Sequence, residues 1–456
     1  MTATAIGRAR SSRVLQGSAW ILIGLGIQAL LGFLFWLLGS RVATSDELGQ
    51  ASALFTAIQF VNYASGLGLT IALARHATRR NAESDALFGW AVAATVVSSV
   101  IGGVAYLALV DTSATRLVTG SPGGWLLFSA YTAGTSIGLL VDVRLMAARR
   151  WGWLVARLAF IGLIRLPLVV LPVSIDPALW LYNLMLAPAA LVAVLTIPVL
   201  HWIGAGSISW HRPQTLGSVA RYAGVNWVAT LSSQAPQFIL PLVVAQSVRP
   251  SVNASFFLAW TVTGLVFLVP AAIAQVLLVE GGKDADGHDS EADAAGLDLL
   301  EGDDPASSAA EGSSAAVVST VTAEGRAKEA LAFSLGLATV AWLASLAIGP
   351  LFAHVFGPGY HRLGRLLPSL MVAGIPWAIT SIRLSEARIR RDQVATVAIT
   401  LTLGLGILLP TLLFVPDGGT LAATRAWVFG NVAGAVVAIA VHHRAMRASA
   451  RALVPD

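Results

Sequence analysis

The chain has no cysteine among its 456 residues, and only 12% of its residues carry a charge. The absence of cysteine excludes a disulfide scaffold and a thiolate metal site. A soluble protein of this size would have about 25% charged residues. Because 56% of the residues are hydrophobic and the mean hydropathy is +0.74, the scarcity of charge predicts an integral membrane protein.

Long apolar runs take the place of charged surface. A membrane-spanning helix needs about 20 mostly apolar residues, and the sequence predicts twelve. The first follows "RARSSR" and is too long for the apolar part of a signal peptide, so we expect it to remain as an anchor. The predicted spans lie near 17–39, 48–74, 86–110, 122–143, 154–173, 178–203, 218–244, 254–279, 330–356, 363–383, 394–415 and 422–442.

Arginine placement orients these spans. If the N-terminus is cytoplasmic, 16 arginines fall on the inner side, before counting those at helix ends, and six fall in outer loops. Positive charge accumulates on the cytoplasmic side of membrane proteins. We therefore expect a multi-pass protein of the cell membrane with both termini in the cytoplasm. The outer arginines are Arg41, Arg116, Arg249, Arg362, Arg365 and Arg425.

The segment 280–329 interrupts the apolar pattern. It holds 13 of the chain's 24 acidic residues but only 3 of its 29 basic residues. A composition so poor in aromatic residues cannot bury enough apolar surface to offset the entropy lost on ordering. We expect a disordered cytoplasmic loop, which is either a tolerated insertion or a docking arm for a basic partner, such as a cytoplasmic glycan-assembly enzyme.

The chain also divides into two similar halves. The segments that begin at Gly17 and Gly224 each place a tryptophan three residues after the glycine and a glutamine further along, at Gln28 and Gln234. Repeated halves in transporters hold the substrate near the membrane midplane, at the interface between the repeats. We expect an N-terminal lobe over 1–210 and a C-terminal lobe over 211–456, the latter interrupted by 280–329.

Three stretches carry a resemblance to a known family. The segment "HVFGPGYHRLGRLLPSLMVAGIPWAI" is similar to the region of polysaccharide-export flippases where the ninth span ends and the tenth begins. The stretches "VLQGSAWILIG" and "ELGQASALFTAIQFVNYASGLGLTIALAR" are similar to their first two spans. The sequence thus resembles the lipid-linked oligosaccharide flippases of the multidrug/oligosaccharidyl-lipid/polysaccharide (MOP) exporter superfamily.

The resemblance implies a fold and a substrate. The fold would be an all-α membrane protein of about 12 helices, in two six-helix lobes that form a V around a central cavity. The partners would be membrane lipid and a polyprenyl-diphosphate-linked glycan, flipped to the outer leaflet by alternating access for polysaccharide or cell-wall export. The resemblance implies no catalytic residue, metal, cofactor or nucleic acid.

Arg165 lies near the middle of the apolar run "WLVARLAFIGLIRLPLVVLP". An arginine at this depth costs at least about 2.5–3.5 kcal/mol, and arginine pairs bidentately with phosphate oxygens. Arg157 lies eight residues earlier, about 12 Å along a helix, and broadly on the same side. Arg165 could instead have a structural role beside Pro167, and Asp142 is a possible partner whose depth fits Arg157 better.

Further residues complete the predicted cavity. Arginines at inner helix ends could capture phosphate or extend to lipid headgroups, and amides within spans could bind sugars or join helices. The candidates for substrate binding are Arg165, Arg157, Arg75, Arg221, Gln28, Asn62, Asn226 and Gln234.

Two other functions stay open at this point. A multidrug or cation antiporter of the same superfamily would need a carboxylate within the membrane, and Asp142 and Glu386 are the acids close to a span on the inner side. A membrane glycan polymerase or transferase would need an acid or base on a structured outer loop. The predicted outer loops are too short to build such a site.

Overall fold

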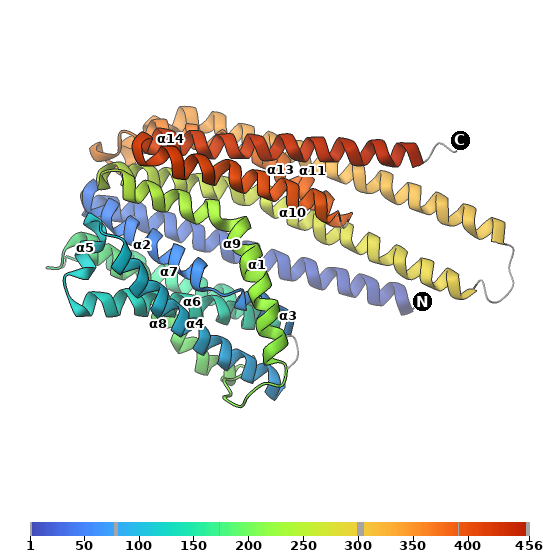
Figure 1. Cartoon of the computed structure of the whole chain (residues 1–456), viewed down its shortest axis with the longest axis horizontal. Helices are drawn as coiled ribbons and strands as arrows, with labels where there is room; N and C mark the ends of the chain where they lie inside the picture. Colours follow the sequence, from blue (N-terminus) through green and yellow to red (C-terminus); the bar gives the residue numbers. More distant parts are fainter. Residues whose placement is uncertain (1, 77–80, 173, 299–304, 391, 453–456) are drawn as a thin grey trace. The chain divides into compact units, whose positions relative to one another are not determined.

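A computed structural model describes the backbone of the whole chain except residues 1, 77–80, 173, 299–304, 391 and 453–456 (Figure 1). Side chains are described for the same residues, apart from 2–19, 21–22, 75–76, 225–226, 228–230, 232–233, 275–276, 278–298, 305–324, 326, 353, 358 and 448–452.

Every regular element in the described residues is a helix. In chain order these are α1 (Thr2–Val42), α2 (Ser45–Ser65), α3 (Leu69–His76), α4 (Ala82–Leu109), α5 (Ser113–Thr119), α6 (Pro122–Ala147), α7 (Trp151–Val169), α8 (Pro177–Trp202), α9 (Leu216–Ser247), α10 (Pro250–Asp298), α11 (Pro305–Phe356), the 3-10 turn η1 (Pro358–Tyr360), α12 (Leu363–Met371), α13 (Gly374–Ile389) and α14 (Gln393–Ala452).

The predicted spans all coincide with helical backbone. Nine helical stretches in the described part are long and apolar enough to cross a membrane. Helices α2 and α3 together make the predicted second span, α9 makes the seventh, and α14 contains the last two. Within α14, Gly419 has φ 57° and ψ −143°, which breaks the helix between them. The prediction of an all-α, multi-pass membrane protein is confirmed.

The chain forms two compact units. The first comprises 1–262, 348–367 and 408–426, and the second comprises 263–347, 368–407 and 427–456. The sequence predicts a different division, into lobes that meet at residue 210, and that division stays a prediction. Each unit has a core of its own: Trp36 packs edge-on against Phe257 in the first, and Phe267 stacks against Trp377 in the second.

Small residues let the helices of the first unit approach closely. Helix α6 packs against α4 and α8, and α7 packs against α1. A side chain at Gly134 of α6 would come within 2.5 Å of Ala190 on α8, and one at Gly162 of α7 would come within 2.5 Å of Leu31 on α1. Such contacts are typical of helix packing in membranes, where small residues allow close approach. The contact at Gly162 sets the rotation of α7 about its axis, and therefore the direction in which both candidate arginines of this helix face.

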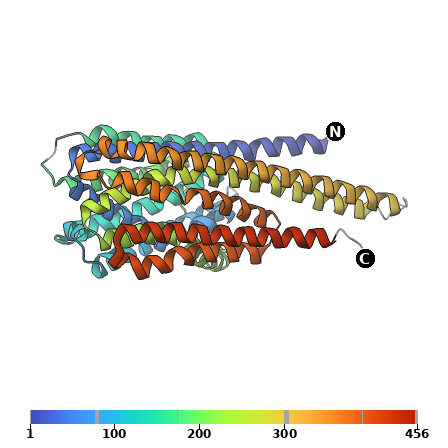
Figure 2. The ribbon, with the colours of Figure 1, turned by 90° about the horizontal axis from the view of Figure 1, so that it is seen from above.

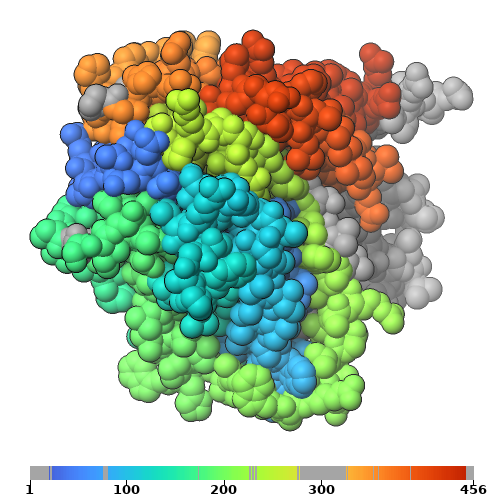
Figure 3. Space-filling view, turned by 60° about the vertical axis from the view of Figure 1, so that its left-hand side comes forward, coloured from blue at the N-terminus to red at the C-terminus, as the bar shows by residue number. Residues whose placement is uncertain are grey.

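The connection between α8 and α9 is tied to the start of α4. Ser207 Oγ donates to Asp85 Oδ2 at 2.7 Å, and Thr215 donates to Glu83 through its backbone N and its hydroxyl. Asp85 also pairs with buried Arg144 of α6. In the space-filling view the connection lies against the beginning of α4 at the lower edge (Figure 3). These bonds hold one end of α9 in place.

The acidic segment was expected to be disordered, and that expectation stays a prediction. Helix α10 continues through Asp298 and α11 begins at Pro305, so most of 280–329 has helical backbone. In both ribbon views these two extensions run side by side (Figures 1 and 2). The segment is rich in alanine, which has the highest helix propensity. Its side of the membrane and any docking role stay predictions.

Candidate functional site

A cavity of about 440 Å³ lies within the first unit, lined by residues of α1, α2, α6, α7, α8 and α9 and by the turn that joins α2 to α3. Helix α7 lines it with Arg157, Ile161 and Arg165, which recur every four residues and therefore share one face of the helix. Both predicted arginines of this span thus face one space.

Arg157 is buried and bound within the protein. Its Nε donates to Asp142 Oδ1 at 3.1 Å, its Nη2 donates to the same oxygen, and Nη2 also reaches the carbonyl of Gly138 at 3.2 Å. The structure confirms that Asp142 fits Arg157. A buried charge is tolerated when it is paired and hydrogen-bonded in this way.

Arg165 is also buried, with only 8% of its surface exposed, but its polar contacts are poor. Its Nη1 donates to the thioether sulfur of Met185 at 3.5 Å, and its buried Nε has no hydrogen-bond partner. Sulfur is a weak acceptor. No carboxylate among the described side chains pairs with Arg165. An unpaired charge at this depth is costly, and such residues mark ligand paths in membrane proteins.

Among the described side chains, the charged residues that line the cavity are Asp142, Arg157 and Arg165. Two positive charges and one negative charge leave a formal charge of +1. Because Asp142 already neutralises Arg157, the excess charge resides at Arg165. The cavity therefore favours an anion that can reach the guanidinium of Arg165.

The predicted amides separate into two groups. Asn62 lines the cavity, but its Nδ2 donates to Thr135 Oγ1 at 2.9 Å and its Oδ1 accepts from Ser136 Oγ at 2.9 Å, which joins α2 to α6. Gln28 and Gln234 also line the cavity and make no hydrogen bond to another described residue. Asn62 therefore acts between helices, whereas the two glutamines are available to a ligand.

Several cavity residues received no role from the sequence. Gln59 lines the same space as Gln234 and Gln237, two amides within the predicted seventh span, and the ring of Tyr63 stacks on that of Phe238 with centroids 4.6 Å apart. The Tyr63 hydroxyl donates to the carbonyl of Leu231. Gln59 carried a detectable signal, a polar side chain inside a predicted span, but the sequence does not reveal which side of the helix faces a cavity.

One of the predicted residues is not brought into the site, and two others are not described. Arg221 is exposed on α9 and does not line the cavity. The side chains of Arg75 and Asn226 lie outside the described residues. Any contribution of these residues to substrate binding stays a prediction.

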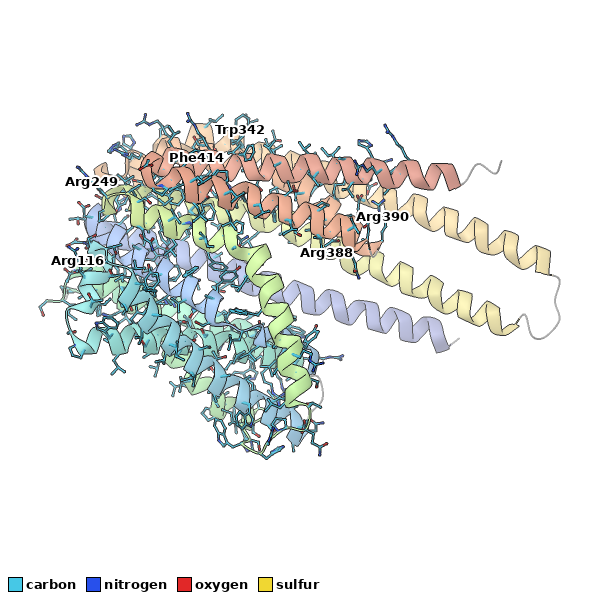
Figure 4. All side chains as sticks on the ribbon, viewed as in Figure 1. Arg116, Arg249, Trp342, Arg388, Arg390 and Phe414 are labelled. Atoms are coloured by element: carbon cyan, nitrogen blue, oxygen red, sulfur yellow. The ribbon has the colours of Figure 1, made fainter. Side chains whose placement is uncertain are left out.

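The second unit contains an ion cluster that the sequence did not predict. Arg383 Nη1 donates to both oxygens of Glu386, at 2.8 and 2.9 Å, and Arg390 Nη2 reaches Glu386 Oε2 at 3.4 Å. His442 Nδ1 lies 3.1 Å from the same oxygen, with a side chain only 11% exposed. Arg390 lies just beyond the last turn of α13 (Figure 4). The packing of α14 brings His442 against the Glu386 carboxylate.

Comparison with known proteins supports the fold. No model of a known protein family and no curated protein matches the chain. Among solved structures, the lipid II flippase MurJ in an inward closed conformation matches with a TM-score of 0.66 at 12% identity, over 93% of this chain and 87% of its own. An inward-facing multidrug resistance MATE family transporter matches with a TM-score of 0.62 at 14% identity, over 95% of this chain and 99% of its own.

A MOP superfamily transporter from Pyrococcus furiosus matches with a TM-score of 0.59 at 14% identity, over 96% of this chain and 95% of its own. These structural neighbours are MOP superfamily members, as the sequence resemblance predicts. At such low identity the likeness shows the fold, which the MOP transporters share, and leaves the substrate to be argued from the cavity.

Proposed function

We propose that this protein is a transporter that flips a polyprenyl-diphosphate-linked oligosaccharide from the cytoplasmic to the outer leaflet by alternating access, for the export of cell-surface polysaccharide or cell-wall glycan. The observation that carries the proposal is Arg165, a buried cation with no acidic partner among the described side chains, in a cavity with an excess positive charge. The lipid II flippase among the structural neighbours supports it.

The chemistry of a diphosphate suits this cavity. Guanidinium stays charged at any working pH and binds phosphate oxygens bidentately. Arg165 would make the first contact, because no carboxylate among the described side chains neutralises it. Arg157 lines the same space and could add a second contact when the diphosphate competes with Asp142. The lipid chain would remain in the bilayer, so the cavity needs to accommodate the polar headgroup.

A multidrug or cation antiporter is the second candidate, and one observation favours it. Asp142 is a carboxylate in the cavity, and such a group could exchange a proton for a cation. However, Asp142 is bound to Arg157, and the cavity would still hold the unpaired charge of Arg165, which repels a cation. The flippase function therefore accounts for both arginines, and the antiporter function accounts for neither.

The proposal is tested by depletion and replacement in the host. Depleted cells would receive wild type, Arg165→Lys, Arg165→Ala or, as a matched control, Arg116→Ala, each at equal membrane levels. Arg116 is exposed and lies outside the cavity. Lipid-linked glycan in the inner leaflet is then measured. We expect the glycan to accumulate with Arg165→Ala and to accumulate less with Arg165→Lys. With Arg116→Ala, as with wild type, we expect no accumulation.

Two outcomes would contradict the proposal. If depletion alone causes no accumulation, the flippase function is wrong. If depletion causes accumulation but Arg165→Ala relieves it fully, the excess charge does not handle the substrate. Efflux of ethidium, a cationic dye, from the same cells addresses the antiporter: efflux that depends on the protein and is lost in Asp142→Asn would favour it.

A further inference from the structure

The cavity has two chemically different sides. Helix α7 supplies the charged side, with Arg157 and Arg165. Helices α2 and α9 supply a neutral polar side that carries carboxamides at Gln59, Gln234 and Gln237. A diphosphate explains the charged side and leaves the neutral side without a function.

The register of α2 and α9 brings the neutral groups together. Gln59 and Tyr63 are four residues apart on α2, and Gln234, Gln237 and Phe238 are three and four residues apart on α9. Residues at these spacings share a helix face. Helices α2 and α9 pack against each other, and the Tyr63 and Phe238 rings stack with an interplanar angle of 23°. Each helix thus presents an aromatic ring and at least one carboxamide to the same space.

These three carboxamides, like that of Gln28, differ from the polar groups around the cavity that bind a neighbouring helix. Asn62, Tyr63 and Trp227 each bind a neighbouring helix or its backbone. Gln59, Gln234 and Gln237 make no hydrogen bond to another described residue, although all three line the cavity. Polar groups within a membrane normally find a partner. Glutamines that have none and face an open space are available to a ligand.

The ligand can be inferred from what a carboxamide offers. Each carboxamide both donates and accepts hydrogen bonds, whereas a diphosphate only accepts them. The matching ligand groups are hydroxyls and acetamides, which also do both. A flat aromatic surface beside a few placed polar groups is typical of a site for a partly apolar ring. A pyranose has this character, because its faces expose C–H groups and its edge carries hydroxyls.

We propose that Gln59, Gln234 and Gln237, beside the stacked rings of Tyr63 and Phe238, form a subsite for the sugar that adjoins the diphosphate. This inference rests on the proposed function and assigns the two parts of the substrate headgroup to different helices. The arginines of α7 bind the diphosphate, which every substrate carrying that group shares. The glutamines of α2 and α9 bind the sugar, and they distinguish a loaded lipid from an empty one.

The test compares two probes on the purified full-length protein in lipid nanodiscs. One probe is the lipid-linked glycan extracted from depleted host cells, and the other is undecaprenyl diphosphate, which carries no sugar. The quantity measured is the ratio of their dissociation constants. We expect wild type to bind the glycan-bearing lipid about tenfold or more tightly, because each hydrogen bond to the sugar contributes a few-fold.

Leucine variants remove the carboxamides with little change in volume. In the triple variant Gln59→Leu, Gln234→Leu, Gln237→Leu we expect the ratio to fall to about twofold or less. Each single variant would lose part of it. The matched control is Gln246→Leu, which lies on α9 outside the cavity lining and should keep the wild-type ratio. Arg165→Ala should weaken the binding of both probes and leave a preference for the glycan.

The ratio distinguishes a failed subsite from a failed function. A triple variant that still binds one probe is folded, and if it keeps the wild-type ratio, the subsite is wrong. A wild-type protein that binds both lipids equally would also overturn the subsite, while the diphosphate site would stand. If wild type binds neither lipid, the proposed function fails and the subsite fails with it. If the triple variant does not fold, the ratio of dissociation constants is measured on the single variants Gln234→Leu and Gln237→Leu. A wild-type ratio in both would overturn the subsite.

Discussion

Arginines with little exposed surface occur in both units of this protein, and the ion cluster of the second unit surrounds Arg383 differently from the way the cavity of the first unit surrounds Arg165. In the second unit, Arg383 donates both of its Glu386 hydrogen bonds within 2.9 Å, and Arg390 and His442 complete the surroundings of that carboxylate. In the cavity of the first unit, the only hydrogen-bond acceptor for Arg165 among the described residues is the thioether sulfur of Met185. An arginine therefore has a carboxylate partner in one region, and in the other region it has none among the described side chains.

The difference separates structural from functional charge. A buried charge that is paired holds helices together, and removing one partner leaves the other uncompensated. A buried charge that is unpaired contributes no such attraction, so its retention needs another explanation. The proposed binding of a diphosphate would supply that explanation for Arg165, whereas its contacts with Glu386 and with His442 of α14 are a sufficient explanation for Arg383. Substitutions that affect stability in one region and ligand binding in the other would establish this distinction.

The largest effect on stability should come from Glu386→Ala. The substitution leaves Arg383, Arg390 and His442 close together without their shared carboxylate. Removing one partner of a buried ion cluster costs about 3–5 kcal/mol. We expect a large drop in the melting temperature of the detergent-solubilised protein, measured by loss of its monodisperse peak on heating. Glu329→Ala, at an exposed position of α11, is the matched control; a melting temperature as high as that control's would show that the cluster is dispensable.

Arg165→Met should have the opposite effects: little change in stability and a large loss of ligand affinity. Methionine fills the same space without a charge, so the melting temperature should stay equal to wild type or rise. The affinity for undecaprenyl diphosphate should fall about 100-fold, which corresponds to about 2.7 kcal/mol, because the excess positive charge of the cavity is gone. A binding titration and a melting curve on one preparation measure both quantities. A drop in melting temperature with no loss of affinity would make Arg165 structural, like Arg383.

The loss of stability on substituting Arg157 should lie between the losses expected for Glu386→Ala and Arg165→Met. Arg157→Met leaves the partly buried carboxylate of Asp142 without this partner, at a cost of about 1–3 kcal/mol. Adding Asp142→Leu should restore most of the lost stability, because an apolar pair can replace a buried ion pair. The melting temperatures of wild type, the two single variants and the double variant form a double-mutant cycle. If the double variant is less stable than either single one, the pair does not act as a unit.

The sequence predicts some of these features better than others, for physical reasons. Arg165 could be found because one charge in an apolar run is visible without knowing its neighbours. The Asp142–Arg157 pair could be anticipated because α6 and α7 are consecutive, so depth alone matches the two residues. The Glu386 cluster could not, because His442 lies 56 residues from Glu386 and only the packing of α14 brings them together. The free glutamines depend in the same way on which face of α9 meets α2.

The smallest effect should come from the exposed pair Asp111–Arg116, a third arrangement in which the charges are paired but lie in water. Both side chains are about 70% exposed, and the hydrogen bond from Arg116 lowers the pKa of Asp111. A carboxylate with a lowered pKa stabilises the fold above its unfolded pKa, and that stabilisation is lost as the pH falls through its folded pKa. Solvent and salt screen an exposed pair, so Asp111→Asn should leave the melting temperature at pH 7 unchanged and remove only a slight acid dependence. A clear drop at pH 7 would mean that exposure does not separate weak pairs from strong ones here, and the contrast between Arg165 and Arg383 would then have to rest on ligand binding alone.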